Sequence, residues 1–206
     1  MAKSAKASPR VDIATRKQAF VRDEIESSAA ALFAERGFRA VTMDDIAESL
    51  GYTKSVLYYY FKNKNEILWL IFSRSLDIYA SAIDAILRKG HPHDIAIREM
   101  IREHAMCVMQ NKNYTTIYNR EESELTDQQR RLLNKRRRDY DQKFETVYKS
   151  GIEKGMFRDI PPHVAISGIL GMCNWLHVWY DEQGSLSAEQ IAGYYATLLS
   201  SGYMTG

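Results

Sequence analysis

Three successive tyrosines, Tyr58, Tyr59 and Tyr60, follow Lys54 and Ser55 near the amino end of the chain. Successive residues of a helix are rotated by about 100°, so the three rings cannot all face one core and at least one must point outward. A tyrosine hydroxyl can bind a phosphate oxygen, and its ring can contact a sugar or a thymine methyl group. Lysine and serine at the start of such a helix can reach base edges in the major groove. These residue types therefore favour recognition of double-stranded DNA.

Two threonines precede helical patterns in the same region. Thr42 begins the sequence Thr-Met-Asp-Asp, in which its side chain can cap a helix and Asp45 can act as the reciprocal partner. Thr53 stands in the corresponding position before the tyrosines. The free N–H groups at the start of a helix attract a phosphate, and Lys64 adds positive charge nearby.

Two short helices and a tight turn would position these side chains. The pattern predicts a helix over residues 43–50, a turn containing Gly51 and a second helix over residues 54–60, which is a helix-turn-helix arrangement. The apolar residues available to lock the two helices together are Ile46, Ala47, Leu50, either Val56 or Leu57, and Phe61. The alternative is a helical hairpin inside a larger bundle, with the three tyrosines as core aromatics.

Helical periodicity continues through the rest of the chain, and no segment alternates at period two as a strand would. Glycines, prolines and capping residues divide it into further helices. We expect one ending at Gly37, one between Asn63 and Gly90, one from Pro92, one over residues 113–121, one between Thr126 and Gly155, one from Pro161 or Pro162, and one from Ser187 onward. The prediction is an all-α fold of about nine helices.

The composition excludes several classes of protein. Of the 206 residues, 45% are hydrophobic and 26% are charged, which is typical of a globular chain and excludes disorder throughout. No apolar run reaches the ~18–20 residues of a membrane span, so we expect no membrane partner. Cys107 and Cys173 form no CxxC pair, which fits a protein of the reducing cytoplasm. The histidines lack ligand spacing, so we expect neither a metal site nor a cofactor.

The first 19 residues are rich in cations and small side chains. They hold Lys3, Lys6, Arg10, Arg16 and Lys17 against Asp12 alone. We expect a disordered basic tail over residues 1–19, which is either a solvated tail or an arm that follows the DNA backbone.

The segment from Phe38 to Leu68 resembles the N-terminal signature of the TetR family of transcriptional regulators. It reads Phe-Arg-Ala-Val-Thr-Met-Asp-Asp-Ile-Ala-Glu-Ser-Leu-Gly-Tyr-Thr-Lys-Ser-Val-Leu-Tyr-Tyr-Tyr-Phe-Lys-Asn-Lys-Asn-Glu-Ile-Leu, and Ala-Leu-Phe-Ala-Glu-Arg-Gly precedes it. The resemblance implies a three-helix DNA-binding domain over residues 20–65 and an effector-binding and dimerisation domain over residues 66–206. It also implies a repressor that binds a near-palindromic operator as a homodimer and is released by a small molecule.

The resemblance assigns DNA contacts to individual residues. Thr42 would be the phosphate-binding cap of the first short helix, and Thr53 would cap the recognition helix. The positions that touch bases or adjacent backbone are Lys54, Ser55, Val56 and Tyr59, and those that touch phosphates are Tyr58, Tyr60 and Lys64. The sequence departs from the commonest family pattern at Tyr52, Ser55 and Tyr59, which puts the operator sequence in doubt.

The last two expected helices form the predicted dimer surface. The first is apolar nearly all round, and its small residues would let a neighbouring helix approach closely. The candidate interface residues are Gly168, Gly171, Trp179, Tyr194, Tyr195 and Leu198. The alternative is a fully buried core helix in a monomer.

Methionines and aromatic residues at helical spacing predict a pocket for a hydrophobic effector, although any single one can be plain core. The candidate lining residues are Trp69, Phe72, Met100, His104, Tyr118, Tyr140, Phe144, Tyr148, Met172 and Trp175, with Tyr79 and Met106 beside them. His104, Asn174 and His177 could orient a ligand.

A basic cluster bears on the effector type. Residues 130–138 include five arginines and Lys135, which form either a solvated face or a site for the nucleotide of an acyl-CoA. The spacing Ile-Tyr-x-x-Glu, Gly-x-x-x-Gly-x-Phe-Arg, Trp-x-x-x-Trp-Tyr and Gly-x-Leu-Ser is also similar to TetR members that respond to CoA thioesters.

Two other functions compete with a ligand-responsive regulator. One is an architectural DNA-binding protein without an effector. The other is an α-helical enzyme that uses Asp44, Asp45, Glu121, Glu122 and His104 as acid–base groups. Nothing in the sequence places a nucleophile, a base and an orienting group together, so we expect no enzyme activity.

Overall fold

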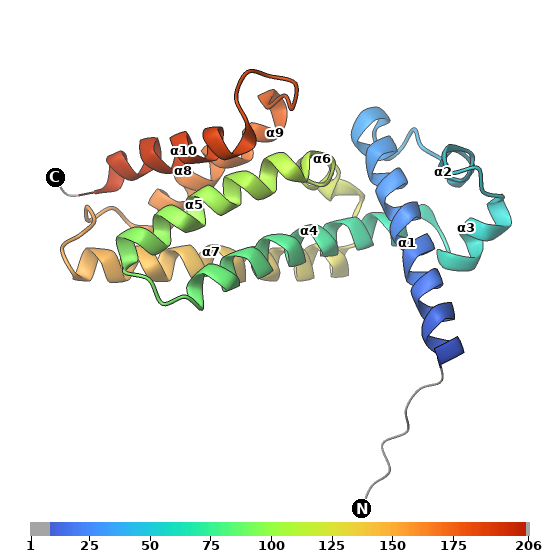
Figure 1. Cartoon of the computed structure of the whole chain (residues 1–206), viewed down its shortest axis with the longest axis horizontal. Helices are drawn as coiled ribbons and strands as arrows, with labels where there is room; N and C mark the ends of the chain where they lie inside the picture. Colours follow the sequence, from blue (N-terminus) through green and yellow to red (C-terminus); the bar gives the residue numbers. More distant parts are fainter. Residues whose placement is uncertain (1–8, 205–206) are drawn as a thin grey trace, which may run out of the picture. The chain divides into compact units, whose positions relative to one another are not determined.

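The structure is a computed structural model that describes residues 9–204, with side chains from residue 15 onward (Figure 1). Its elements in chain order are α1 (Pro9–Arg36), α2 (Met43–Ser49), α3 (Lys54–Tyr60), α4 (Lys64–Leu87), α5 (His93–Gln110), α6 (Lys112–Arg120), the 3₁₀ helix η1 (Glu122–Glu124), α7 (Asp127–Glu153), α8 (Pro162–Asn174), α9 (Leu176–Trp179) and α10 (Ala188–Tyr203). Within residues 9–204 the only extended pairing is an isolated bridge between Phe157 and Met204. The predicted all-α fold is confirmed.

The chain divides into two compact units, residues 1–71 and 72–206. The expected boundary after residue 65 therefore lies six residues too early, because the first turns of α4 carry Ile67, Leu68 and Ile71, which are fully buried. Helix α4 is continuous across the boundary.

Helix α1 begins at Pro9, so the prediction of a disordered tail over residues 1–19 is wrong for residues 9–19. Proline suits the first position of a helix, and no glycine or second proline interrupts the segment after it. The small side chains of this segment were mistaken for a sign of disorder. Residues 1–8 lie outside the described residues.

The α2–α3 pair forms with the predicted capping box at Thr42, whereas Thr53, which was expected to cap α3, makes no side-chain capping bond. Thr42 Oγ1 accepts a hydrogen bond from the Asp45 N–H at 3.1 Å, and Asp45 Oδ2 accepts one from the Thr42 N–H at 2.7 Å. Gly51 ends the first helix at a φ of 67°, a conformation that costs glycine no steric strain. Tyr52 fits the turn because its hydroxyl donates to Glu24 of α1 at 2.8 Å.

Helix α5 lies at the centre of the second unit, and its neighbours include α7, α8 and α10. Most of its residues are buried, including Ile97, Met100 and Ile101 at 0% exposure. Two ion pairs tie α4 to α7: Arg136 pairs with Asp77, and Lys143 Nζ lies 2.5 Å from Asp84 Oδ1.

The segment expected to form one helix from Pro161 or Pro162 breaks at Trp175 into α8 and α9. His177 Nδ1 donates to the Asn174 carbonyl at 2.6 Å, and the Val178 N–H bonds to Trp175 instead. The side chain thus takes the acceptor that a continuous helix would have used for its backbone. His177 is therefore engaged by the backbone and is absent from the cavity described below.

Candidate functional site

One face of α3 is open to solvent, and the opposite face anchors the helix in the first unit. Leu57 is fully buried, whereas Tyr58 and Tyr59 are 47% and 69% exposed. Lys54 and Ser55, one turn earlier on the same side, are also exposed. The expectation that the tyrosines cannot all face the core is confirmed, and the helix presents a polar and aromatic surface.

Tyr59 is held in place at the centre of this surface. Its hydroxyl accepts a hydrogen bond from Gln18 Nε2 of α1 at 2.9 Å. Its ring meets that of the partly buried Tyr60 edge to face at 5.0 Å. These contacts reduce the number of rotamers that a binding partner would have to order.

Lys54 forms an exposed ion pair with Asp44 of α2, with Nζ at 2.9 Å from Oδ2. The bond to Asp44 raises the pKa of Lys54, so this side chain is a cation throughout the neutral range. Val56 is partly buried, and Thr53 is exposed at the start of α3 but makes no side-chain capping bond. Thr42 is exposed at the start of α2.

Lys64, which the resemblance assigns to a phosphate, makes three hydrogen bonds inside the first unit. Its ammonium donates to the carbonyl oxygens of Phe38, Arg39 and Val41 at 2.8, 3.3 and 2.8 Å. It also lies 4.4 Å from the centre of the Phe38 ring. An ammonium has three N–H donors, and all are used to hold the connection between α1 and α2.

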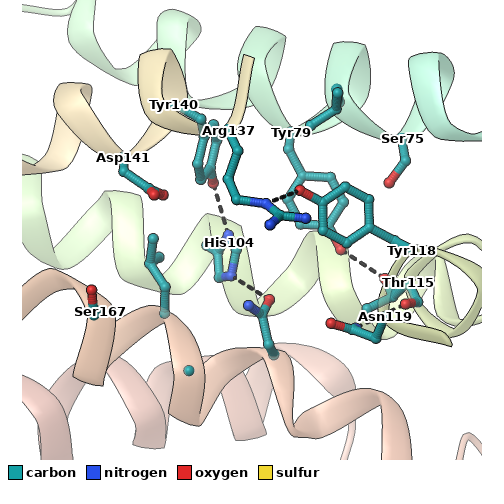
Figure 2. A pocket seen from close by; sticks show the side chains of 14 residues that line it. Ser75, Tyr79, His104, Thr115, Tyr118, Asn119, Arg137, Tyr140, Asp141 and Ser167 are labelled. Carbon is teal, nitrogen blue, oxygen red and sulfur yellow. Dashed lines mark hydrogen bonds between the residues drawn. The ribbon is translucent and has the colours of Figure 1, made fainter. Parts of the chain in front are cut away.

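The second unit contains a cavity of about 260 Å³. Side chains from α4, α5, α6, α7 and α8 line it (Figure 2). Of the predicted pocket residues, the structure brings together His104, Tyr118, Tyr140 and Tyr79, along with Asn174.

A buried hydrogen-bond chain crosses this cavity. The Tyr140 hydroxyl and His104 Nδ1 are 2.7 Å apart, and His104 Nε2 and Asn174 Oδ1 are 3.0 Å apart. Burial lowers the pKa of His104 to about 4, so the ring is neutral at pH 7. Since Asn174 Oδ1 can only accept, Nε2 carries the proton and Nδ1 accepts from Tyr140.

The remaining pocket candidates lie elsewhere. Phe72, Met100, Phe144 and Tyr148 are fully buried in the core and do not line the cavity. Met172 and Trp175 are 47% and 61% exposed, and Trp69 belongs to the first unit. Met106 is a buried core residue. An apolar stripe at helical spacing does not distinguish side chains that fill a core from those that border a cavity.

Several polar lining residues were missed. They are Ser75, Thr115, Asn119, Arg137, Asp141 and Ser167. A signal existed for Arg137, since it lies between the buried residues Leu133 and Tyr140 at spacings of four and three, on the inward stripe of α7. From the sequence, Arg137 belongs to the basic cluster of residues 130–138, as part of either a solvated face or a nucleotide site, and was not assigned to the apolar pocket.

Helices α8, α9 and α10 of the second unit carry exposed apolar side chains. Gly168 and Gly171 are exposed, and a Cβ added to either would meet no atom within 4 Å. The large apolar side chains exposed on the same helices and on α10 are Val164, Met172, Trp175, Val178, Trp179, Tyr194 and Leu198. Tyr195 is partly buried and packs against the core. Gly171 also lines the cavity.

The motif Gly-x-x-x-Gly-x-Phe-Arg, which is similar to that of CoA-responsive members, contains residues that pack against each other in the core. A Cβ at Gly151 would lie 2.0 Å from the ring of Phe157, so this ring requires glycine beneath it. Gly155 turns the chain after α7 at a φ of 70°. Both glycines therefore serve the fold.

The acid–base candidates have structural partners. Asp44 pairs with Lys54, and Asp45 accepts the bonds from Thr42 that lower its pKa. His104 is 4% exposed. No group of three or more potential metal ligands occurs within the described part of the chain, and none of its helices is both long and apolar enough to cross a membrane.

Comparison with known proteins agrees with both units. Residues 25–69 match the family described as bacterial regulatory proteins, tetR family, and residues 79–203 match the tetracyclin repressor-like C-terminal domain. The chain is 30% identical over 192 residues to the HTH-type transcriptional repressor KstR2 of Mycobacterium tuberculosis, covering 88% of this chain and 92% of the relative.

Solved structures are similar over nearly the whole chain. The ketosteroid transcriptional regulator KstR2 of Mycobacterium tuberculosis has a TM-score of 0.84 at 26% identity, covering 90% of this chain and 95% of that one. AibR in complex with isovaleryl coenzyme A and operator DNA has a TM-score of 0.78 at 25% identity, covering 86% and 96%.

Proposed function

The chain belongs to the TetR family of bacterial transcriptional regulators, and we propose that it is a ligand-responsive repressor that binds its operator through α3. The observation that carries the proposal is the exposed face of α3, where Lys54, Ser55, Tyr58 and Tyr59 lie together in a helix-turn-helix. The side chains of Lys54 and Ser55 can donate hydrogen bonds to phosphates or base edges. The rings of the two tyrosines can contact sugars and thymine methyl groups.

The operator is bound by a homodimer. A single short helix contacts too few bases for useful affinity, and family members pair two such helices about 34–36 Å apart on a near-palindrome. The exposed apolar side chains of α8, α9 and α10 support this pairing, because large apolar side chains left open to solvent on neighbouring helices are typical of an interface.

The effector occupies the cavity of the second unit. Its apolar body would contact Leu76 and Leu170, while the His104–Tyr140–Asn174 chain would orient a polar group. An acyl-CoA is the class we favour, supported by the similarity to AibR, which was solved with isovaleryl coenzyme A. The cavity of about 260 Å³ suits an acyl group, and the nucleotide would remain outside it.

Exposure of the protein to fragmented genomic DNA, followed by sequencing of the retained fragments, tests the DNA function. We expect enrichment of one near-palindromic sequence. Tyr59→Ala should lose this enrichment while keeping the wild-type thermal stability, because Tyr59 is 69% exposed. Uniform retention of all fragments by the wild type would contradict the proposal.

The effector function is tested on the complex with the enriched fragment. Isovaleryl-CoA or octanoyl-CoA should release the DNA, as measured by fluorescence anisotropy, whereas CoA alone should not. If no thioester changes the DNA affinity while the selected operator still binds, the alternative of an effector-independent architectural protein is favoured.

A further inference from the structure

Arg137 is the one arginine among the described residues that line the cavity, and it already has two hydrogen-bond partners. The Arg137 Nε donates to the Tyr118 hydroxyl at 2.8 Å, and its Nη2 donates to Glu122 Oε2 at 2.8 Å. The guanidinium lies 5.1 Å from the centre of the Tyr118 ring. Figure 2 shows this group projecting from α7 among the tyrosines that line the cavity.

The bond to Glu122 uses only one of the nitrogens of the Arg137 guanidinium. A guanidinium can bind a carboxylate through two parallel N–H donors, whereas Glu122 accepts from Nη2 alone. No hydrogen bond from Nη1 is found within the described residues. The side chains of Arg137 and Glu122 are 38% and 33% exposed, so this ion pair contributes only modestly to stability.

Asp141 is the acidic residue among those that line the cavity, and its carboxylate would repel an anion bound beside it. Burial, and then the nearby carboxylate of Glu145, raise the pKa of Asp141. In Figure 2 Asp141 lies on the side of Arg137 away from Tyr118. The Tyr118 end of the cavity is therefore where a negative charge is stabilised.

We propose that the effector carries an oxyanion, a carboxylate or a phosphate, that takes the place of Glu122 on Arg137. The proposal rests on the proposed effector function of the cavity and assigns the chemistry of its charged end. Glu122 acts as an internal competitor, and its release loosens η1, the short helix that joins α6 to α7.

Matched ligand pairs identify the anion in the absence of DNA. One pair is octanoate against octanamide, which differ in charge; the other is octanoyl-CoA against S-octanoylpantetheine, which lacks phosphates. Isothermal titration of the wild type should show stronger binding of the anionic member of one pair. A preference in the first pair assigns a carboxylate, and a preference in the second assigns a phosphate.

Variants of Glu122 and Arg137 test whether Glu122 competes with the anion for Arg137 or only holds Arg137 in position. Glu122→Gln should bind the preferred anion about two- to five-fold more tightly, because a part-exposed ion-pair competitor is removed. Arg137→Gln should bind both members of that pair equally. Lys149→Gln, which removes an exposed cation of α7 that does not line this cavity, should behave as the wild type.

Hydrogen exchange reports on the release of η1. The Glu124 and Leu125 amides donate within this turn at 3.0 and 3.2 Å, and their exchange should quicken when the anion binds. The proposal is overturned if neither pair shows a preference that depends on Arg137, or if Glu122→Gln weakens binding of the anion. Because these measurements omit DNA, their failure leaves the operator-selection result standing.

Discussion

His104 shows how burial sets the behaviour of a single side chain. It is 4% exposed, and burial lowers its pKa from 6.5 to about 4. The unfolded chain therefore binds a proton at this position between pH 6.5 and pH 4 while the folded chain does not. Stability must then fall as the pH decreases through this window.

The free energy of unfolding should decrease by roughly 2 kcal/mol between pH 6.5 and 5 because of this residue. Denaturation by urea at a series of pH values measures the decrease. His104→Gln should flatten the curve in this window, whereas His163→Gln, at an exposed position, should leave it unchanged. Equal slopes in all three proteins would show that the pKa of His104 is the same in the folded and the unfolded chain.

The role of a single residue could be predicted where its helical position and its residue type point to the same role. It could not be predicted where the role depends on contacts with residues far away in the sequence. The outward position of Tyr59 follows from its helical register. The role of Lys64 depends on carbonyls 23 to 26 residues earlier in the chain, and the role of Arg137 depends on a cavity formed by several helices. No local pattern contains that information.

The connection between α1 and α2 depends on a contact made by a residue of α4. Lys64, at the start of α4, donates to three carbonyls of this connection. Its removal leaves partly buried acceptors without a donor, which costs about 1–3 kcal/mol.

Lys64→Ala should therefore lower the free energy of unfolding by about this amount, as measured by urea denaturation. Lys62→Ala is the matched control, because Lys62 is exposed and its substitution should stay within about 0.5 kcal/mol of the wild type. Similar small effects at both positions would return Lys64 to the list of available phosphate contacts.

At the element scale, capping chemistry was the most reliable signal in the sequence. The boxes at Thr42, Thr126 and Ser187 are all present where the sequence predicts them. The break between α8 and α9 was not predictable, because it depends on a histidine that competes for a backbone carbonyl. The extent of α1 was missed because the small residues of its first part were taken to indicate disorder.

At the scale of the whole molecule, the exposed apolar surface of α8, α9 and α10 must be covered in the dimer that we propose. Trp175 is 61% exposed at its centre, and Leu198 is 63% exposed on α10. Trp175→Glu should give a monomer in sedimentation equilibrium and weaken operator binding at least tenfold, since burying an unpaired charge in an interface is costly.

The control for this prediction is Ile95→Glu, which places the same charge at a 43% exposed apolar position on α5, outside the dimer surface. This variant should remain a dimer. Dimers from both variants, or monomers from both, would show that the surface is not the specific interface.

The central claim is that two copies of α3 read one duplex in a fixed geometry, and hydroxyl-radical footprinting of the selected operator tests it most directly. We expect two protected segments related by dyad symmetry, centred one helical turn, about 34–36 Å, apart on one side of the DNA. Both should disappear together in Tyr59→Ala. A single protected segment, or protection without symmetry, would contradict the claim.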